Sequence, residues 1–470
     1  MLKQILISII ALAGLVSAKF SFDDIKFNEY NFTQLVDHTQ GSSDKRTFNQ
    51  RYFVSTDYFD KDTGPVFLYI CGEGTCKPPT DRGYPVMVAK VMSAMFVVLE
   101  HRFYGSSQPF EDWQTANLHY LNATLALADL ANFIDYVQSS IKAQYGGNDR
   151  KVVTIGGSYP GALSAWFKAA YQDKAVAAWS SSGVIQPIRN FDLFDTDIYT
   201  ATSRSGPLCP QVIQEITTYI DTAFRNHEKG KDDDYSYILR VFGIDQVKNA
   251  GDFMFFIADI FTIGVQYGGR KELCQILMSL EFTDVKNRVP VIAQYAKNQK
   301  LDFSQYDRVA LQNVTYDIDK NMRQWTWQYC TEFGWFQVPA DKNPMRSAYI
   351  NADYWVPYCE EVFGIKIGDP NIKYYTDTYG GLDINAKNIY FVNSIEDPWQ
   401  WAGMRTIHNK DTQKDLVATL IDCNDCGHCQ DLKTPSDADP PALRLARDDI
   451  LLKLKGWINP TTPKERLFLE

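Results

Sequence analysis

The sequence has too little positive charge to suit a protein that binds nucleic acid. It carries 47 Lys and Arg against 57 Asp and Glu, a formal net charge of −10, whereas a binder of the phosphate backbone needs a basic face. Glycine and proline are not enriched, at 28 and 20 of 470 residues, which excludes collagen-like and low-complexity chains. After the N-terminal segment no run approaches the ~18 uncharged apolar residues of a spanning helix, so we expect no membrane span.

Apolar residues, by contrast, are plentiful enough for a large folded core. Hydrophobic residues make up 45% and aromatic residues 14% of the 470 positions, which excludes an intrinsically disordered chain. At ~150 residues per domain the length alone predicts about three units. The composition therefore indicates a large, folded, acidic protein.

The N-terminus has the pattern of a secretory signal peptide at residues 1–18. Lys3 is the only charge before Lys19, residues 5–16 are apolar, and Val16, Ser17 and Ala18 offer small residues at a cleavage site. The alternative is an N-terminal membrane anchor. A signal peptide predicts the secretory pathway, with the lysosome, the vacuole or the extracellular space as destination.

Secretion makes the cysteines and the Asn-x-Thr sequences interpretable. In an oxidising compartment we expect several disulfides, and the odd count of nine cysteines leaves at least one thiol unpaired. Asn31, Asn122 and Asn313 each begin a glycosylation sequon. We therefore expect a disulfide-bonded glycoprotein.

Strand and helix patterns alternate in two parts of the chain. Short apolar runs predict buried strands at residues 65–71, 94–100, 151–155, 175–179, 388–392 and 415–421. Helical spacing predicts helices at residues 125–143, 162–171 and 441–457, and dominates residues 185–387. Alternating strands and helices indicate an α/β fold with a parallel sheet. We expect a core built from residues 19–184 and 388–470, interrupted by a helical insertion at residues 185–387.

A candidate nucleophile, Ser158, lies between a predicted strand and a predicted helix in the sequence Gly156-Gly-Ser-Tyr-Pro-Gly161. A sharp strand-turn-helix connection holds a serine out at the end of the sheet, and the N–H of Tyr159 would then face the oxyanion. Pro160 departs from the G-x-S-x-G pattern, although proline is tolerated in a first helical turn. The alternative is an ordinary Gly-Ser surface turn.

The order of the triad on an α/β-hydrolase fold, Ser then acid then His, limits the partners. Of the histidines after Ser158, His227 lies inside the expected insertion and His408 in a helix predicted at residues 399–408. His428 follows the last predicted strand and is the preferred base. Asp397 follows the strand at residues 388–392 and would orient His428. Glu396 is the fallback acid.

Two loops carry further candidates. Gly72 and Glu73 follow the first predicted strand, so a backbone N–H there, from Gly72 in particular, would be the second oxyanion donor. The Glu73 carboxylate would hold a substrate's α-amino group, or is an ordinary loop charge. The sequence Cys423-x2-Cys426-x-His428-Cys429 also matches a zinc-ligand cluster, but the signal peptide favours disulfides there, so we expect no metal and no cofactor.

Four motifs give the chain a family resemblance. They are Glu100-His-Arg-Phe-Tyr-Gly105, Gly156-Gly-Ser-Tyr-Pro-Gly161, Asp397-Pro-Trp399 and Gly427-His-Cys-Gln-Asp-Leu432. With these the chain resembles the S28 family of serine peptidases over nearly the whole mature length. The segment Tyr69-Ile-Cys-Gly-Glu-Gly74 is most similar to the thymus-specific branch of that family.

The resemblance implies an α/β-hydrolase core with a large helical cap inserted before the catalytic Asp, and cleavage of peptides after proline, typically at acidic pH. It implies the triad Ser158, Asp397 and His428, a proline pocket lined by Trp399, and a homodimer. From Glu100 to Gly105 the residues themselves predict no chemistry.

We therefore expect a secreted or lysosomal serine exopeptidase of the Pro-X carboxypeptidase kind. The alternatives are a dipeptidyl peptidase of the same family, an esterase or lipase with the same triad, and a binding protein without activity. The sequence lacks the HGGG-like loop typical of lipases, and it retains all three triad residues.

Overall fold

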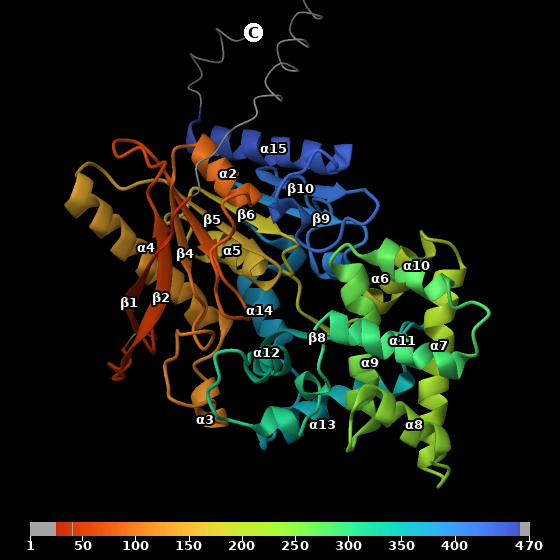
Figure 1. The fold of residues 1–470 in the computed structure, drawn as a ribbon. Helices are drawn as coiled ribbons and strands as arrows, with labels where there is room; N and C mark the ends of the chain where they lie inside the picture. Colours follow the sequence, from red (N-terminus) through yellow and green to blue (C-terminus); the bar gives the residue numbers. More distant parts are fainter. Residues whose placement is uncertain (1–24, 40, 461–470) are drawn as a thin grey trace, which may run out of the picture.

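The computed structural model describes residues 25–39 and 41–460 (Figure 1). The predicted signal peptide at residues 1–18 lies outside the described residues. Eight strands form one sheet in the order β1-β2-β4-β3-β5-β6-β9-β10. They are β1 Asn28–Leu35, β2 Thr47–Ser55, β3 Val66–Ile70, β4 Met95–Leu99, β5 Val152–Gly157, β6 Ala177–Ser181, β9 Ile389–Ser394 and β10 Leu416–Ile421.

Only β2 in this sheet runs against its neighbours. It pairs antiparallel with β1 and β4, and every other neighbouring pair is parallel. This order and direction are those of the α/β-hydrolase fold, so the predicted fold class is confirmed. The six strands predicted from apolar runs correspond to β3, β4, β5, β6, β9 and β10.

Helices cover both faces of the sheet, as a parallel sheet requires. One face packs against α2 and α15, the other against α4 and α5 (Figure 1). The bounds of these helices, and of the short α3, are α2 Tyr84–Val91, α3 Thr115–Leu118, α4 Ala123–Tyr145, α5 Tyr159–Ala170 and α15 Pro441–Ile458. Every residue of β4, β6 and β9 is buried, which explains their unbroken apolar or small-residue sequences.

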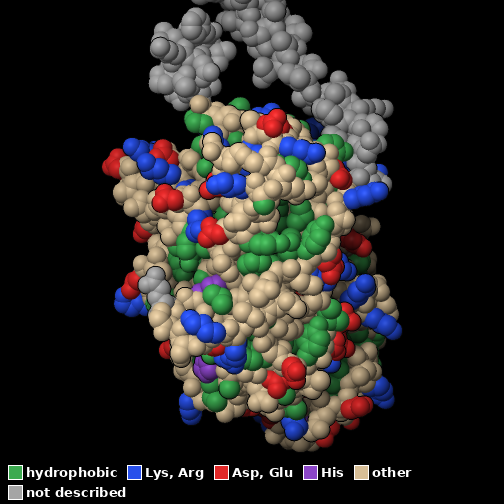
Figure 2. Space-filling view, turned by 90° about the vertical axis from the view of Figure 1, so that its left-hand side faces the viewer, with side chains coloured by type: hydrophobic (Ala, Val, Ile, Leu, Met, Phe, Trp, Pro, Cys, Tyr) green, Lys and Arg blue, Asp and Glu red, His purple; other side chains and the backbone are tan. Residues whose placement is uncertain are grey.

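No sequence pattern predicted β1 and β2, which lie at one edge of the sheet. Along β1 most side chains are exposed, and along β2 exposed and buried side chains roughly alternate. Figure 2 views the molecule from this side, where apolar side chains gather between charged ones. Tyr30 of β1 is 49% exposed and stacks on Tyr52 of β2. Such half-exposed strands lack the continuous apolar run that marked the others.

The chain between β6 and β9 is mostly helical and lies beside the sheet (Figure 1). Its helices are α6 Asp192–Ser203, α7 Leu208–His227, α8 Asp233–Phe242, α9 Ala250–Gln266, α10 Arg270–Met278, α11 Val285–Asn298, α12 Met322–Gln328, α13 Ala352–Phe363 and α14 Ile372–Tyr379. Two short strands, β7 (Ile188–Asn190) and β8 (Gly334–Phe336), pair in parallel within it. The domain borders at residues 185 and 387 stay a prediction. None of the described helices is long and apolar enough to cross a membrane.

The nine cysteines form four disulfides and leave one thiol, that of Cys429. The pairs are Cys71–Cys76, Cys209–Cys274, Cys330–Cys359 and Cys423–Cys426. Two of the four bonds cross-link the helical segment between β6 and β9. The expectation of several disulfides and one unpaired thiol is confirmed.

Candidate active site

Ser158 occupies the sharp connection between β5 and α5. Its backbone has φ 66° and ψ −130°, a conformation that costs a non-glycine residue energy and is typical of strained functional turns. The turn is tight enough to need glycine on both sides of the serine. A Cβ added to Gly156 would lie 2.1 Å from the carbonyl oxygen of Pro160, and one added to Gly161 would lie 2.8 Å from that of Ser181.

The predicted base and acid lie against each other. Nδ1 of His428 is 2.7 Å from Oδ2 of Asp397, and both side chains are buried. Asp397 follows β9, and its Oδ1 accepts a hydrogen bond from the backbone N–H of Trp399. Asp397 therefore caps a short 3-10 helix with one carboxylate oxygen and contacts His428 with the other.

The second ring nitrogen of His428 is available for chemistry. Its Nε2 is buried and has no hydrogen-bond partner among the described residues. Because Asp397 accepts the Nδ1 proton, Nε2 is the nitrogen that would take a proton from a nucleophile. Burial disfavours the charged ring, but Asp397 and Cys429 outweigh this, so the pKa of His428 is raised well above its usual value.

Neither alternative partner fits the site as well. Glu396 is buried in ion pairs with Arg270 and Arg204. The prediction of a helix at residues 399–408 is wrong. Only a 3-10 helix, Pro398–Ala402, forms there, and it ends at Gly403, whose backbone is extended. His408 lies beyond it in irregular chain, where its backbone N–H donates to Gln413.

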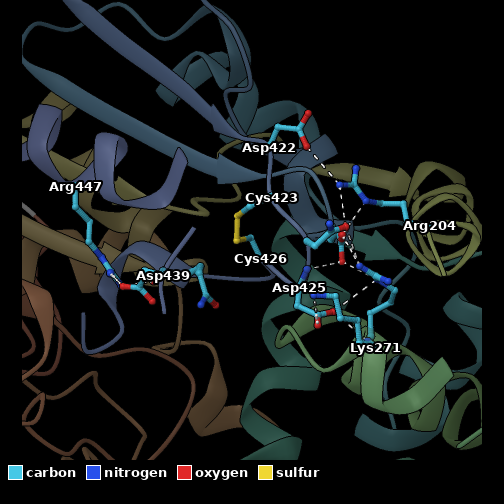
Figure 3. The surroundings of a disulfide bond; sticks show 12 residues. Arg204, Lys271, Asp422, Cys423, Asp425, Cys426, Asp439 and Arg447 are labelled. Atoms are coloured by element: carbon cyan, nitrogen blue, oxygen red, sulfur yellow. Dashed lines mark hydrogen bonds and ion pairs between the residues drawn. A yellow bond between two sulfur atoms is a disulfide. The ribbon is translucent and has the colours of Figure 1, made fainter. Parts of the chain in front are cut away.

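The loop that carries His428 is fastened on several sides (Figure 3). The Cys423–Cys426 disulfide closes its first part. Asp425 accepts a hydrogen bond from the backbone N–H of Lys271 and forms an ion pair with its side chain. Because these two thiols are bonded to each other, they are not zinc ligands, and the described residues contain no cluster that could hold a metal ion.

The loop after β3 approaches the nucleophile turn closely. A Cβ on Gly72 would lie 2.5 Å from Cγ of Pro160, so only glycine brings the backbone this near. Glu73 lines the same cavity as Ser158. Its Oε2 is buried without a hydrogen-bond partner among the described residues, and burial raises its pKa.

Glu100, whose motif suggested no chemistry, fastens this loop. Its carboxylate accepts hydrogen bonds from the backbone N–H of Cys76, the hydroxyl of Ser107 and the guanidinium of Arg51. Cys76 in turn is bonded to Cys71 at the start of the loop. The motif thus positions the segment that contains Gly72 and Glu73.

The Glu100 carboxylate also fills the space beside Gly105, so that a side chain at position 105 should destabilise the fold. The φ of Gly105 is +52°, and an added Cβ would lie 1.9 Å from Oε1 of Glu100. We expect Gly105→Ala to lower the free energy of unfolding by about 4 kcal/mol, since strain and a displaced buried carboxylate add. In the matched control Gly243→Ala φ is +70° and ψ is +31°, the left-handed helical region, and the space is open, so only the backbone penalty of about 1–2 kcal/mol applies. Equal losses in urea denaturation would contradict this reasoning.

A cavity of about 270 Å³ opens between the nucleophile turn and the helical segment. Its wall is rich in aromatic rings and includes Ser158, Glu73, Asp259, Gln266 and Trp399. The Trp399 ring lies 5.0 Å from Phe194, centroid to centroid, and its Nε1 donates to Gln266. A second cavity, of about 480 Å³, shares Glu73 with the first.

Asp259 and Gln266, both from α9, line the cavity without having been predicted from the sequence. The carbonyl oxygen of Gln266 accepts the backbone N–H of His428 at 2.6 Å. Neither residue belongs to a recognisable motif. The signal that would have found them is the helical spacing of the α9 residues that line the cavity: Phe255, Asp259, Thr262, Ile263 and Gln266.

Behind the nucleophile turn, Tyr159 joins a buried polar network. Its hydroxyl bonds with Nε2 of His101 and accepts from the amide of Gln328. Gln328 lies one helical turn from Glu332, which accepts hydrogen bonds from the backbone N–H of Ala123 and the hydroxyl of Tyr375. Burial raises the pKa of Glu332 to about 8. The network links the core to the helical segment.

The three predicted glycosylation sites differ in how far the asparagine side chain is exposed to solvent. Asn31 and Asn313 are exposed, whereas Asn122 is half-buried. The side chain of Asn122 caps α4 by accepting from Leu125 and donates to the carbonyl of His119. Glycosylation at the three sites stays a prediction.

Comparison with known proteins identifies the family to which the chain belongs. The family model described as serine carboxypeptidase S28 matches residues 34–450. The chain belongs to the S28 family. It is therefore a serine-type peptidase, and the resemblance in its motifs is confirmed.

Several S28 relatives match most of this peptidase. A probable serine protease, EDA2, of Arabidopsis thaliana is 32% identical over 86% of this chain and 81% of its own. The human thymus-specific serine protease is 25% identical over 88% and 84%. The human lysosomal Pro-X carboxypeptidase is 28% identical over 91% and 87%.

Proposed function

We propose that this S28 peptidase is an exopeptidase that cleaves after proline, with Ser158 as nucleophile, His428 as base and Asp397 as the residue that orients His428. The observation that carries the proposal is the buried Asp397–His428 pair, with Nε2 unpartnered, beside a cavity that the strained Ser158 lines. These are the parts that a serine acyl-transfer mechanism requires.

In this mechanism Ser158 Oγ attacks the scissile carbonyl carbon while His428 Nε2 takes the hydroxyl proton. The backbone N–H groups of Tyr159 and Gly72 stabilise the oxyanion. His428 then gives its proton to the leaving amine as the C–N bond breaks. Water hydrolyses the resulting ester by the same route in reverse. The residues themselves supply every proton transfer, so the mechanism calls for no cofactor.

We propose that the cavity lined by Ser158 and Trp399 selects the substrate. Trp399 and the neighbouring aromatic rings offer a flat apolar wall that suits the proline ring. The Glu73 carboxyl, with one oxygen unpartnered, faces the bound peptide. We propose that residues 185–387 act as a cap over this cavity and thereby restrict entry to chain ends. A Pro-X carboxypeptidase and a dipeptidyl peptidase share all these features and differ in the chain end that they bind.

We place the enzyme in the secretory pathway, ending in the lysosome, the vacuole or outside the cell. Four disulfides suit an oxidising compartment, and relatives bear the name lysosomal Pro-X carboxypeptidase. The homodimer also stays a proposal, which sedimentation of the purified protein tests.

Labelling and substrate profiling together test the proposed function. A fluorophosphonate should label the wild-type protein at Ser158, and the labelled protein should lose its activity. Of two peptide sets, with proline next to the N-terminus or next to the C-terminus, one should be cleaved on the carboxyl side of that proline. Its alanine counterparts should be cleaved about 10-fold or more slowly, since the apolar pocket loses a ring. Labelling with hydrolysis of acyl esters but of no peptide would instead indicate an esterase.

A further inference from the structure

Strand β1 lies at an edge of the central sheet, and among the described strands it pairs only with β2. The register of this pair, continued by one residue, places Val36 opposite Arg46, and the N–H of Val36 donates to the carbonyl of Arg46. Because hydrogen-bonded pairs alternate along an antiparallel ladder, the even-numbered residues of β1 bond to β2. The backbone N–H and C=O groups of Glu29, Asn31 and Thr33 therefore point away from the sheet.

This edge lacks the features that usually keep other chains from pairing with it. Proteins protect edge strands with lysines, prolines, bulges or very short strands. Strand β1 has eight residues, its register with β2 is unbroken, and its sequence NEYNFTQL contains no proline and no basic residue. Its single charge is Glu29, which lies 3.8 Å from the guanidinium of Arg51. An exposed edge of this length and low charge is a template for another strand.

The strand is complementary to a second copy of itself. Antiparallel pairing centred on Asn31 brings the outward groups of Glu29 to those of Thr33, and those of the two Asn31 residues to each other. The two glutamates then face threonines, so no like charges lie opposite each other. Tyr30, which is 49% exposed, lies opposite Phe32 in this register, and aromatic cross-strand pairs are favourable.

Asn31 lies at the centre of this edge and begins the sequon Asn31-Phe-Thr33. The side chains of Asn31 and Thr33 are both exposed. Directly opposite residues of two antiparallel strands have Cβ atoms about 5 Å apart, which leaves no room for two glycans on facing Asn31 residues. A bulky, solvated glycan at this position also covers the neighbouring N–H and C=O groups.

We propose that Asn31 carries an N-linked glycan that covers the free edge of β1 and prevents two copies of the chain from pairing through it. The glycan takes the place of the lysine or proline that protects other edge strands. Without it, the β1 strands of two copies join antiparallel into one continuous sheet. The inference is independent of the catalytic mechanism, because β1 contributes no residue to the cavity beside Ser158.

Sedimentation of the glycosylated protein, purified from a secretory host, tests the inference. Mass spectrometry of its glycopeptides should find Asn31 occupied. Asn31→Gln and Thr33→Ala each remove the sequon, and each should double the sedimenting mass at tens of micromolar protein, whatever the oligomeric state of the wild type. In the associated form, hydrogen exchange should slow at the outward amides of Glu29, residue 31 and residue 33, since they gain partners.

Three matched variants separate the edge from the loss of a sugar. Thr33→Ser keeps the sequon and should sediment like the wild type. Asn313→Gln removes a predicted, exposed glycosylation site of the helical segment and should also sediment like the wild type. Asn31→Lys removes the glycan but places two lysines opposite each other in the pair, so this variant should not associate.

Three results would overturn the inference. They are an unmodified Asn31 in the purified wild-type protein, wild-type sedimentation of both Asn31→Gln and Thr33→Ala, and association of Asn31→Lys as strong as that of Asn31→Gln. The last result would place the contact elsewhere on the molecule. If Asn31→Gln fails to fold, Thr33→Ala decides the question, because it removes the glycan and leaves Asn31 in place.

Discussion

Replacing Ser158 with alanine is expected to lower kcat/KM on proline peptides by about 10⁵-fold, because the enzyme loses its nucleophile while the remaining groups still bind substrate. His428→Ala should cost about as much, and the double variant little more, since the residues act as a unit. Asp397→Asn should cost about 10⁴-fold, because His428 then loses the partner that fixes its tautomer. Steady-state kinetics on a proline-containing fluorogenic peptide measures all of these changes.

The control for this prediction is Ser140→Ala. Ser140 lies exposed on α4 and its hydroxyl bonds only to the carbonyl of Tyr136 within its own helix, so its loss should leave both activity and labelling intact. The Ser158→Ala protein should melt within a few degrees of the wild type and should not react with a fluorophosphonate. Full peptidase activity in Ser158→Ala would refute the mechanism.

The free energy of unfolding is expected to fall as the pH rises from about 5 to 8, and two buried carboxyl groups, those of Asp197 and Glu332, supply comparable shares of the fall. The Glu332 carboxyl is buried, and burial raises its pKa from 4.5 to about 8. Between these two values the folded protein binds a proton that the unfolded chain has released, so folding loses stability with rising pH. The complete loss for one such group is on the order of 5 kcal/mol. Burial also raises the pKa of Asp197 to about 8, with the same sign.

Urea denaturation at pH 5, 6.5 and 8 measures this slope. The isosteric variant Glu332→Gln should reduce the slope by about half, because Glu332 no longer titrates while Asp197 still does. At pH 5 the variant should be less stable than the wild type, because its hydrogen bonds to Ala123 and Tyr375 are altered. The matched control Glu272→Gln removes an exposed carboxylate and should leave the slope unchanged. A stability that rises from pH 5 to pH 8 would contradict the assignment.

Much of the central sheet could be predicted because its strands are buried on both faces. Residues such as Val97 in β4 and Phe391 in β9 lie in continuous apolar runs that stand out in the sequence. The edge strand β1 and its neighbour β2 could not be found in this way, because many of their side chains are exposed. The end of the 3-10 helix at Ala402 depends on an extended Gly403, which the helical spacing of the neighbouring residues concealed.

The candidate triad could be predicted for a different reason, which is order along the chain. Glycine on both sides of Ser158, and loops after strands for Asp397 and His428, are local signals that survive without a structure. Asp259 carries no such signal, because it lines the cavity only once distant segments of the chain have folded around it. Glu100 likewise could not be understood until the loop that ends at Cys76 was seen to fold onto its carboxylate.

The pairing of β6 with β9 has a consequence for how the protein is made. About 200 residues separate these neighbours in the chain, and at ~5–20 residues per second a ribosome needs roughly 10–40 s to synthesise them. During that time the edge of β6 has no partner strand and is a template for wrong pairing, so a chaperone or the growing helices must shield it. The same delay keeps Asp397 and His428 away from Ser158 until translation is nearly finished, and no half-made chain is a peptidase.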